Sequence, residues 1–225
     1  MIDAELVHAQ GLLAKGVARA GLYDAIMRDG VRGPGTELSR ASIPLPDVAP
    51  SLGGGPDVLA IQEFGDHLDL FSKMSDSALR TLVGRRAGKV RLVWRNAPDP
   101  KNPDARKAAV AAQNVFEMGG DARFWPLHEL LTARAGLPGR IDNETLRRFL
   151  GRSVAEAGTL MWLLQSDRSS TVELDITAAN RAALRSSAVV VGDVVFDRLP
   201  PMRILEQVID RALAQRAEEK HRRQP

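Results

Sequence analysis

Residues 57–96 read DVLAIQEFGDHLDLFSKMSDSALRTLVGRRAGKVRLVWRN and contain three segments with different periodicities. The first, 57–64, is a short apolar run rich in strand-forming residues, and the second, 70–86, has its apolar residues at helical spacing. The third, 89–96, alternates apolar and polar residues and is followed by APDPKNPD, which stops a strand. The order strand, helix, strand predicts a βαβ unit in which the two strands are parallel.

The chain after residue 96 adds a helical block and a second half of the sheet. Residues 104–184 are almost entirely helical in pattern, and AVVVGDVVF at 188–196 predicts a hairpin that turns at 192–193. A long final helix has Pro201 near its first turn. A βαβ half, a helical block and a ββα half together predict an α/β protein: a thioredoxin fold with an α-helical insertion.

The N-terminal part of the chain lies outside this pattern. Residues 3–29 predict two short amphipathic helices, which are not stable alone and must pack on the main domain or on another chain. A connector rich in glycine and proline follows over 30–57, and SIPL at 42–45 is a candidate edge strand. These boundaries divide the chain into an N-terminal helical extension with its linker (1–41), a main domain (42–215) made of a thioredoxin core (42–103 and 185–215) and the insertion (104–184), and a basic C-terminal tail (216–225).

Composition limits the kinds of function open to the chain. Its 225 residues are 44% hydrophobic and 26% charged, which is typical of a globular protein with a buried core. The net charge of +3 comes mostly from scattered arginines and aromatics are only 4%, so we predict no nucleic-acid binding. We also predict no membrane insertion, because no apolar run is long enough to span a bilayer.

The sequence contains no cysteine. This excludes thiol catalysis, disulfide bonds and thiolate metal ligands. The four histidines, His8, His67, His128 and His221, are far apart and show no zinc-site spacing. We therefore predict neither a metal site nor a cofactor.

Three motifs carry a resemblance to a known family. EFGDH at 63–67, VRLVWRN at 90–96 and FWPLHELL at 124–131 stand in this order along the chain. They resemble motifs of the DsbA-like family of thioredoxin-fold proteins, in which EFSDF leads into a CPFC-type redox motif, the next strand reads VRLVFKNFPL and the insertion carries FWxxHxxL. The resemblance covers roughly residues 42–215 and leaves the N-terminal helices outside it.

Two departures from the family bear on activity. The four redox-motif positions hold Asp69, Leu70, Phe71 and Ser72, so both cysteines are replaced. The cis-proline loop, GTPT in the family, corresponds to the segment with Ser187 and Ala188, where we predict a trans peptide because cis bonds without proline are costly. Asp69, just before a helical pattern, is expected to cap the following helix, and the resemblance implies that it keeps the negative charge of the family's thiolate. The site is thus predicted to be a degenerate redox centre.

Alternative roles for the polar residues near this motif stay open. His67, Asp69 and Ser72 could form a hydrolytic triad, although no nucleophile elbow is present in the sequence. Kappa-type glutathione transferases share the DsbA-like architecture and use a serine near the helix start. Glu63 is an auxiliary polar residue that either assists proton transfer or pairs with an arginine, and His128 is predicted to be hydrogen-bonded inside the insertion.

The sequence therefore predicts a redox-inactive DsbA-like protein that binds or scaffolds a polypeptide and has no catalytic residues. It is not a thiol-disulfide oxidoreductase; the alternative is a glutathione-dependent or hydrolytic enzyme that uses Ser72, His67 and Asp69. The N-terminal helices could also form a homodimer. The resemblance implies the cell envelope or periplasm, but MIDAELVHAQ lacks the pattern of a signal peptide, which leaves the compartment open.

Overall fold

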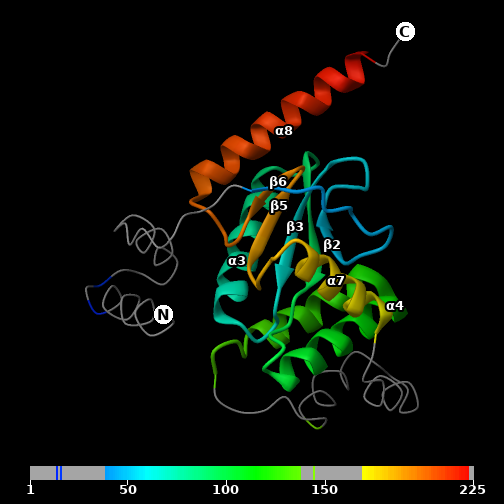
Figure 1. Cartoon of the computed structure of the whole chain (residues 1–225), viewed down its shortest axis with the longest axis vertical. Helices are drawn as coiled ribbons and strands as arrows, with labels where there is room; N and C mark the ends of the chain where they lie inside the picture. Colours follow the sequence, from blue (N-terminus) through cyan, green and yellow to red (C-terminus); the bar gives the residue numbers. More distant parts are fainter. Residues whose placement is uncertain (1–13, 15, 17–38, 138–143, 145–168, 223–225) are drawn as a thin grey trace.

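The computed structural model describes residues 14, 16, 39–137, 144 and 169–222. The predicted helices within 3–29, two of the helices predicted in the insertion, and Trp162 lie outside the described residues. Within the described part the structure has six strands and four helices (Figure 1): β1 (Ser39–Arg40), β2 (Ser51–Gly53), β3 (Leu59–Gly65), α3 (Leu70–Arg85), β4 (Val90–Asn96), α4 (Pro103–Thr132), α7 (Ser170–Arg181), β5 (Ala188–Val191), β6 (Val194–Phe196) and α8 (Met202–Arg222).

The strands form one sheet in the order β1-β6-β5-β3-β4-β2. β3 and β4 are parallel, with Leu59 opposite Val90 at one end and Gly65 opposite Asn96 at the other. β5 and β6 form an antiparallel hairpin, and β5 pairs antiparallel with β3. Gly192 in the hairpin turn has a φ of 63°, a left-handed conformation that glycine adopts without strain. The predicted βαβ and ββα halves of a thioredoxin fold are confirmed.

Helices cover both faces of this sheet. Because side chains alternate along a strand, β3 and β4 send one set of residues toward α3, α8 and α4 and the other set toward α7. The first set includes Ile61 and Trp94, which are fully buried. The second includes Phe64, which packs with residues of β5 and α7. We refer to these as the α3 face and the α7 face.

One predicted feature, the edge strand at 42–45, differs from the structure. Residues 42–45 form no strand, since Pro44 and Pro46 lack the N–H groups of a ladder; the neighbouring β2 instead pairs antiparallel with β4. The break in α4 agrees with the sequence pattern: Gly120, with a φ of 62° and a ψ of −159°, breaks the helix at the point where the pattern passes from one predicted helix (104–119) to the next (121–136).

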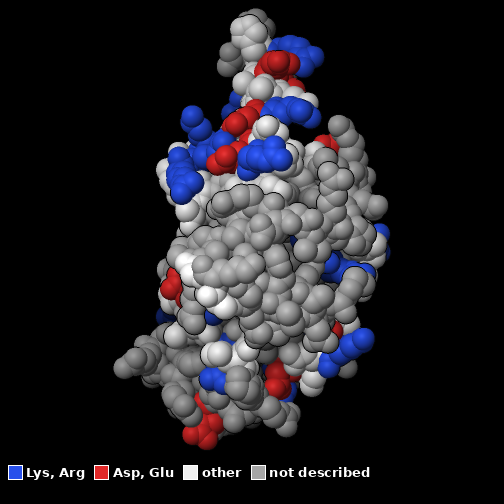
Figure 2. Space-filling view, turned by 90° about the vertical axis from the view of Figure 1, so that its left-hand side faces the viewer, with Lys and Arg blue, Asp and Glu red and all other residues white. Residues whose placement is uncertain are grey.

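The predicted final helix is confirmed, and it runs through the boundary drawn for the C-terminal tail at residue 216. α8 continues to Arg222, because alanine, glutamate and lysine are good helix formers, and it projects beyond the sheet (Figure 1). Figure 2 shows basic and acidic side chains mixed along this helix. None of the helices in the described part of the chain is long and apolar enough to cross a membrane.

Candidate functional site at the start of α3

Asp69 caps the N-terminus of α3, as predicted. Its Oδ2 accepts hydrogen bonds from the backbone N–H of Ser72 at 2.7 Å and from the Ser72 hydroxyl at 3.0 Å. The same hydroxyl oxygen accepts a bond from the backbone N–H of Asp66 at 3.1 Å, and Ser72 is fully buried. The Ser72 hydroxyl is therefore held by the loop and the cap on both its donor and acceptor sides.

The loop between β3 and α3 is held by Asp66, a residue that the sequence did not single out. Its Oδ1 accepts from the backbone N–H of Leu68 at 2.8 Å, and its Oδ2 accepts from that of Asp99 at 3.0 Å. Burial raises the pKa of Asp66 above its ordinary value of 3.8, although both backbone bonds lower it. An aspartate directly after a buried strand is the signal by which this role could have been predicted.

The three residues of the possible triad do not assemble. Neither ring nitrogen of His67 makes a hydrogen bond, while the Ser72 hydroxyl bonds to Asp66 and Asp69. A serine nucleophile needs its hydroxyl on an imidazole that takes its proton. This geometry gives Ser72 no imidazole to take its proton.

His67 instead packs among aromatic rings on the α3 face. Its ring centroid lies 4.8 Å from that of Trp94 and 5.1 Å from that of His128. Burial lowers the pKa of His67 well below its ordinary value of 6.5, and the neighbouring His128 lowers it further. In the folded protein His67 is thus a neutral, buried imidazole.

Glu63 is buried on the same face and has no hydrogen-bond partner for either carboxylate oxygen. Burial raises its pKa well above 4.5, the nearby Asp76 raises it further, and Arg80 lowers it. The predicted pairing of Glu63 with an arginine is not formed, since Arg80 makes its ion pairs with Asp76 at 3.8 Å and with Glu129. Burial thus favours the neutral form of Glu63, which lies near Asp76 and Arg80 of α3.

His128 reaches this region from α4. Its Nε2 lies 3.3 Å from Oδ1 of Asp76 on α3, and its ring packs against Trp94 and Trp125 at 4.6 and 5.1 Å between centroids. The predicted hydrogen bond within the insertion is absent, because neither ring nitrogen of His128 has a hydrogen-bond partner. Glu63, His67, Asp76 and His128 together form what we call the acid–histidine cluster. Among the described residues no group of histidines and carboxylates is arranged to hold a metal ion.

Gly65 leaves room for the indole in the middle of this cluster. A Cβ at this position would lie 2.2 Å from Cη2 of Trp94. The indole N–H of Trp94 donates to Oδ1 of Asn96 at 3.1 Å. The pair of a glycine and a large aromatic residue thus fixes how Trp94 lies against His67 and His128.

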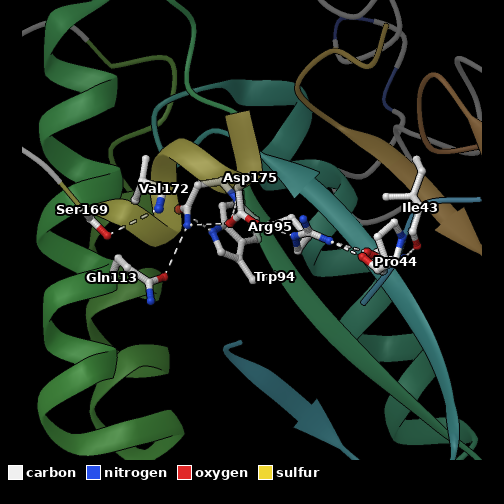
Figure 3. A network of polar contacts seen from close by, with 10 residues as sticks. Ile43, Pro44, Trp94, Arg95, Gln113, Ser169, Val172 and Asp175 are labelled. Atoms are coloured by element: carbon white, nitrogen blue, oxygen red, sulfur yellow. Dashed lines mark hydrogen bonds and ion pairs between the residues drawn. The ribbon is translucent and has the colours of Figure 1, made fainter. Parts of the chain in front are cut away.

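A second buried polar group lies on the α7 face (Figure 3). Arg95 forms a buried ion pair with Asp175 of α7 and donates to Oε1 of Gln62 at 2.7 Å. Asn96 donates to Oδ2 of Asp175 from its backbone at 2.9 Å and from its side chain at 3.2 Å. We call Gln62, Arg95, Asn96 and Asp175 the Arg95–Asp175 network.

This network also fastens the connector before β2. Gln62 donates to the carbonyl of Ile43 at 3.0 Å, and Arg95 donates to that of Pro44 at 3.2 Å. Burial raises the pKa of Asp175 above 3.8, while Arg95 and Asn96 lower it. The carbonyls of the predicted edge strand thus bond to side chains of the sheet.

Solved structures of several bacterial proteins are similar to this chain. BdbD from Bacillus subtilis, in its oxidised form, matches with a TM-score of 0.65 and 20% identity, covering 74% of this chain and 93% of its own. The thiol-disulfide exchange protein alpha-DsbA2 from Wolbachia pipientis matches with a TM-score of 0.59 and 17% identity, covering 72% and 86%. This is a DsbA-like thioredoxin fold. A periplasmic thioredoxin-like protein from Salmonella enterica serovar Typhimurium matches this DsbA-like fold with a TM-score of 0.54 and 18% identity, covering 74% and 90%. No family model matches the sequence, and no curated protein matches it significantly.

The DsbA-like fold is present here without the chemistry of thiol exchange. The chain contains no cysteine, so it cannot exchange disulfides. The peptide bond before Ala188 is trans, as predicted, and Ser187 before it has a φ of 70°. Such a left-handed conformation is uncommon for serine and marks a constrained loop at the start of β5.

Apolar side chains remain exposed at the start of α3 in this DsbA-like domain. Phe71, in the first turn, is 40% exposed, and Leu137 is 60% exposed. Gly136 connects Leu137 to this region, because its backbone N–H donates to the carbonyl of Leu68 at 3.4 Å. We call the half-buried Leu68 and Leu70, together with Phe71 and Leu137, the Phe71 surface.

Proposed function

We propose that this chain is a redox-inactive DsbA-like protein that binds or scaffolds a polypeptide through the Phe71 surface. The observation that carries the proposal is the state of the old redox positions. Asp69 and Ser72 bond to each other and to the loop, so they offer no reactive group, while Phe71 between them stays exposed. A site that has lost its nucleophile and kept an exposed aromatic residue is suited to contact rather than to reaction.

The chemistry around Phe71 favours an apolar segment of a polypeptide. Leucine and phenylalanine side chains offer only apolar area, and burying such area against a partner is the main favourable contribution to binding. Lys73 lies beside this surface with its ammonium group donating to the carbonyl of Ala133 at 3.4 Å. Binding should therefore depend on Phe71 far more than on the charge at Asp69.

Crosslinking tests the proposal directly. A photoreactive phenylalanine analogue at position 71 should capture a polypeptide in cells, whereas the same analogue at the exposed Thr81, ten residues further along α3, should not. With purified protein, Phe71→Ser should weaken binding of a permanently unfolded reporter polypeptide at least about fivefold, and Thr81→Ser should leave binding unchanged. Equal capture from both positions, or equal affinity of both variants, would contradict the proposal.

Glutathione binding to the purified protein tests the alternative function. Saturable glutathione binding that Ser72→Ala weakens would favour the glutathione-dependent enzyme over the binding module. The buried and doubly bonded Ser72 hydroxyl supports the opposite expectation, namely no saturable binding.

We also propose that the protein acts in the cell envelope. The similar structure from Salmonella enterica is that of a periplasmic thioredoxin-like protein, which supports this location. A homodimer formed by the N-terminal helices stays a prediction, because those helices lie outside the described residues.

A further inference from the structure

We propose that the acid–histidine cluster is a proton-operated contact, which loosens the second half of α4 (residues 121–132) from α3 and β4 in mildly acidic solution. The proposal concerns how the insertion is held on the thioredoxin core. It holds whatever the Phe71 surface binds.

The cluster lies where three elements meet. His128 comes from α4, Asp76 from α3, and His67 from the loop after β3, while the Trp94 ring of β4 contacts both imidazoles. Phe124 of α4 also packs on His67, with ring centroids 6.2 Å apart. Protonation of these imidazoles would therefore change how α4 packs on α3 and β4.

The two histidines differ in how they can accommodate a charge. An imidazolium at His128 would lie 3.3 Å from the Asp76 carboxylate. An imidazolium at His67 would lie against Trp94 and Phe124, with neither nitrogen hydrogen-bonded. A buried charge without a partner is costly, so His67 can take up a proton only when water reaches it. Water reaches it when the second half of α4 moves away.

The other charged groups facing the cluster do not compensate His67. Glu63, from β3, is kept protonated by burial and by the charge of Asp76. Arg80 of α3 adds a positive charge: it pairs with Glu129 of α4 and lies 5.5 Å from the Trp125 ring centroid. The Arg80 contacts are partly exposed and would act as the remaining tether between α3 and α4.

The sequence departs from the family pattern at these same positions. EFGDH has glycine and histidine where the family reads EFSDF, and VRLVWRN has tryptophan where the family reads VRLVFKN. Gly65 makes room for Trp94, and Trp94 packs on His67. The titrating residue thus stands where phenylalanine is the usual occupant, which makes His67→Phe a well-matched neutral replacement.

The direction of the pH effect follows from linkage. The closed form excludes a proton from His67, since its pKa is lowered, and the open or unfolded form accepts that proton with its ordinary pKa of 6.5. The stability of the closed form is therefore complete well above pH 6.5 and falls as the pH drops below it.

Amide hydrogen exchange of the full chain at about pH 7.5 and about pH 5.5, corrected for intrinsic rates, tests the proposal. Protection of residues 121–132 should fall by up to about tenfold at the lower pH, which is the limit for one proton taken up with a pKa of 6.5, while β5 stays protected. In His67→Phe, protection of 121–132 should be the same at both pH values. His221→Phe, at the exposed end of α8, should respond to pH like the wild type.

Three outcomes would overturn the proposal. They are equal protection of 121–132 at both pH values in the wild type, an unchanged pH response in His67→Phe, and loss of β5 protection together with that of α4, which would indicate global acid unfolding. If His67→Phe folds poorly, His67→Leu provides a second neutral variant for the same comparison. None of these results bears on the proposed function, because reporter binding by Phe71→Ser is measured separately.

Discussion

Two buried polar regions lie on opposite faces of the same two strands, and they differ in how their polar atoms are satisfied. In the Arg95–Asp175 network every buried side-chain nitrogen and oxygen has a hydrogen-bond partner. In the acid–histidine cluster both oxygens of Glu63 and both ring nitrogens of His67 and His128 have none. Gln62 and Glu63 are adjacent in β3 and equally buried, yet only Gln62 is bonded.

This difference separates structural from titratable polar residues. A fully bonded buried network rigidifies the fold and holds the connector and α7 in place. Burial without hydrogen bonds raises the pKa of Glu63 and lowers that of His67, so the protonation of these two groups is linked to conformation. The residues of both regions are buried, so burial alone does not distinguish the structural polar residues from the titratable ones.

The largest expected effect comes from breaking the satisfied network. Asp175→Ala leaves Arg95 buried without its carboxylate and removes two bonds to Asn96, so we expect a loss of about 3–5 kcal/mol in the free energy of unfolding. Denaturant unfolding at neutral pH measures it.

Glu173 provides a matched control on the same helix. It pairs with Arg106 at the surface, where both side chains are more than a third exposed. Glu173→Ala should cost at most about 1 kcal/mol. Equal losses in Asp175→Ala and Glu173→Ala would remove the structural role assigned to the network.

A smaller effect is expected from crowding the aromatic centre of the cluster. Gly65→Ser places a side chain into the Trp94 ring, and we expect a loss of about 1–3 kcal/mol. Adding Trp94→Phe should recover much of that loss, because the smaller ring makes room. The unfolding free energies of both single variants and the double variant form the test; strict additivity would show that Gly65 and Trp94 are not coupled.

The smallest change in the free energy of unfolding is expected from Glu63→Gln in acidic solution. The difference from wild type should depend on pH. The folded protein holds a proton on Glu63 that the unfolded chain releases above about pH 4.5, so Glu63 contributes stability that is lost as pH rises. Glutamine cannot ionise, and the variant should therefore gain stability relative to wild type between about pH 5 and pH 8. A stability difference between wild type and variant that stays constant with pH would contradict the raised pKa of Glu63.

Local patterns predicted the fold and the cap, whereas contacts between distant segments escaped them. Periodicity was enough to predict β3, α3 and β4, and an aspartate before a helical pattern was enough to predict the Asp69 cap. The contact of His128 with Asp76 joins residues 52 positions apart, and nothing local specifies it. The unpaired state of Glu63 could not be predicted either, because it depends on where Arg80 finds its partners.

The same reasoning explains the failed edge strand at 42–45. A strand former such as Ile43 favours a ladder, but the carbonyls of Ile43 and Pro44 are taken by Gln62 and Arg95 across the sheet. The Arg95–Asp175 network, which sequence reasoning missed, is thus what decided the path of the connector. The available signal was Arg95, which is next to Trp94 and Asn96 at the end of the strand pattern.

The central claim is that positions 69 and 72 are those of a thioredoxin-type redox centre with both cysteines replaced. The most direct test is the double variant Asp69→Cys with Ser72→Cys, in which free thiols are counted before and after oxidation of the folded protein. The account predicts that the fold is retained, that both thiols disappear into one disulfide, and that oxidase activity is poor because Ala188 replaces the cis-proline. Two thiols that stay free under a strong oxidant, in a variant that remains folded, would contradict it.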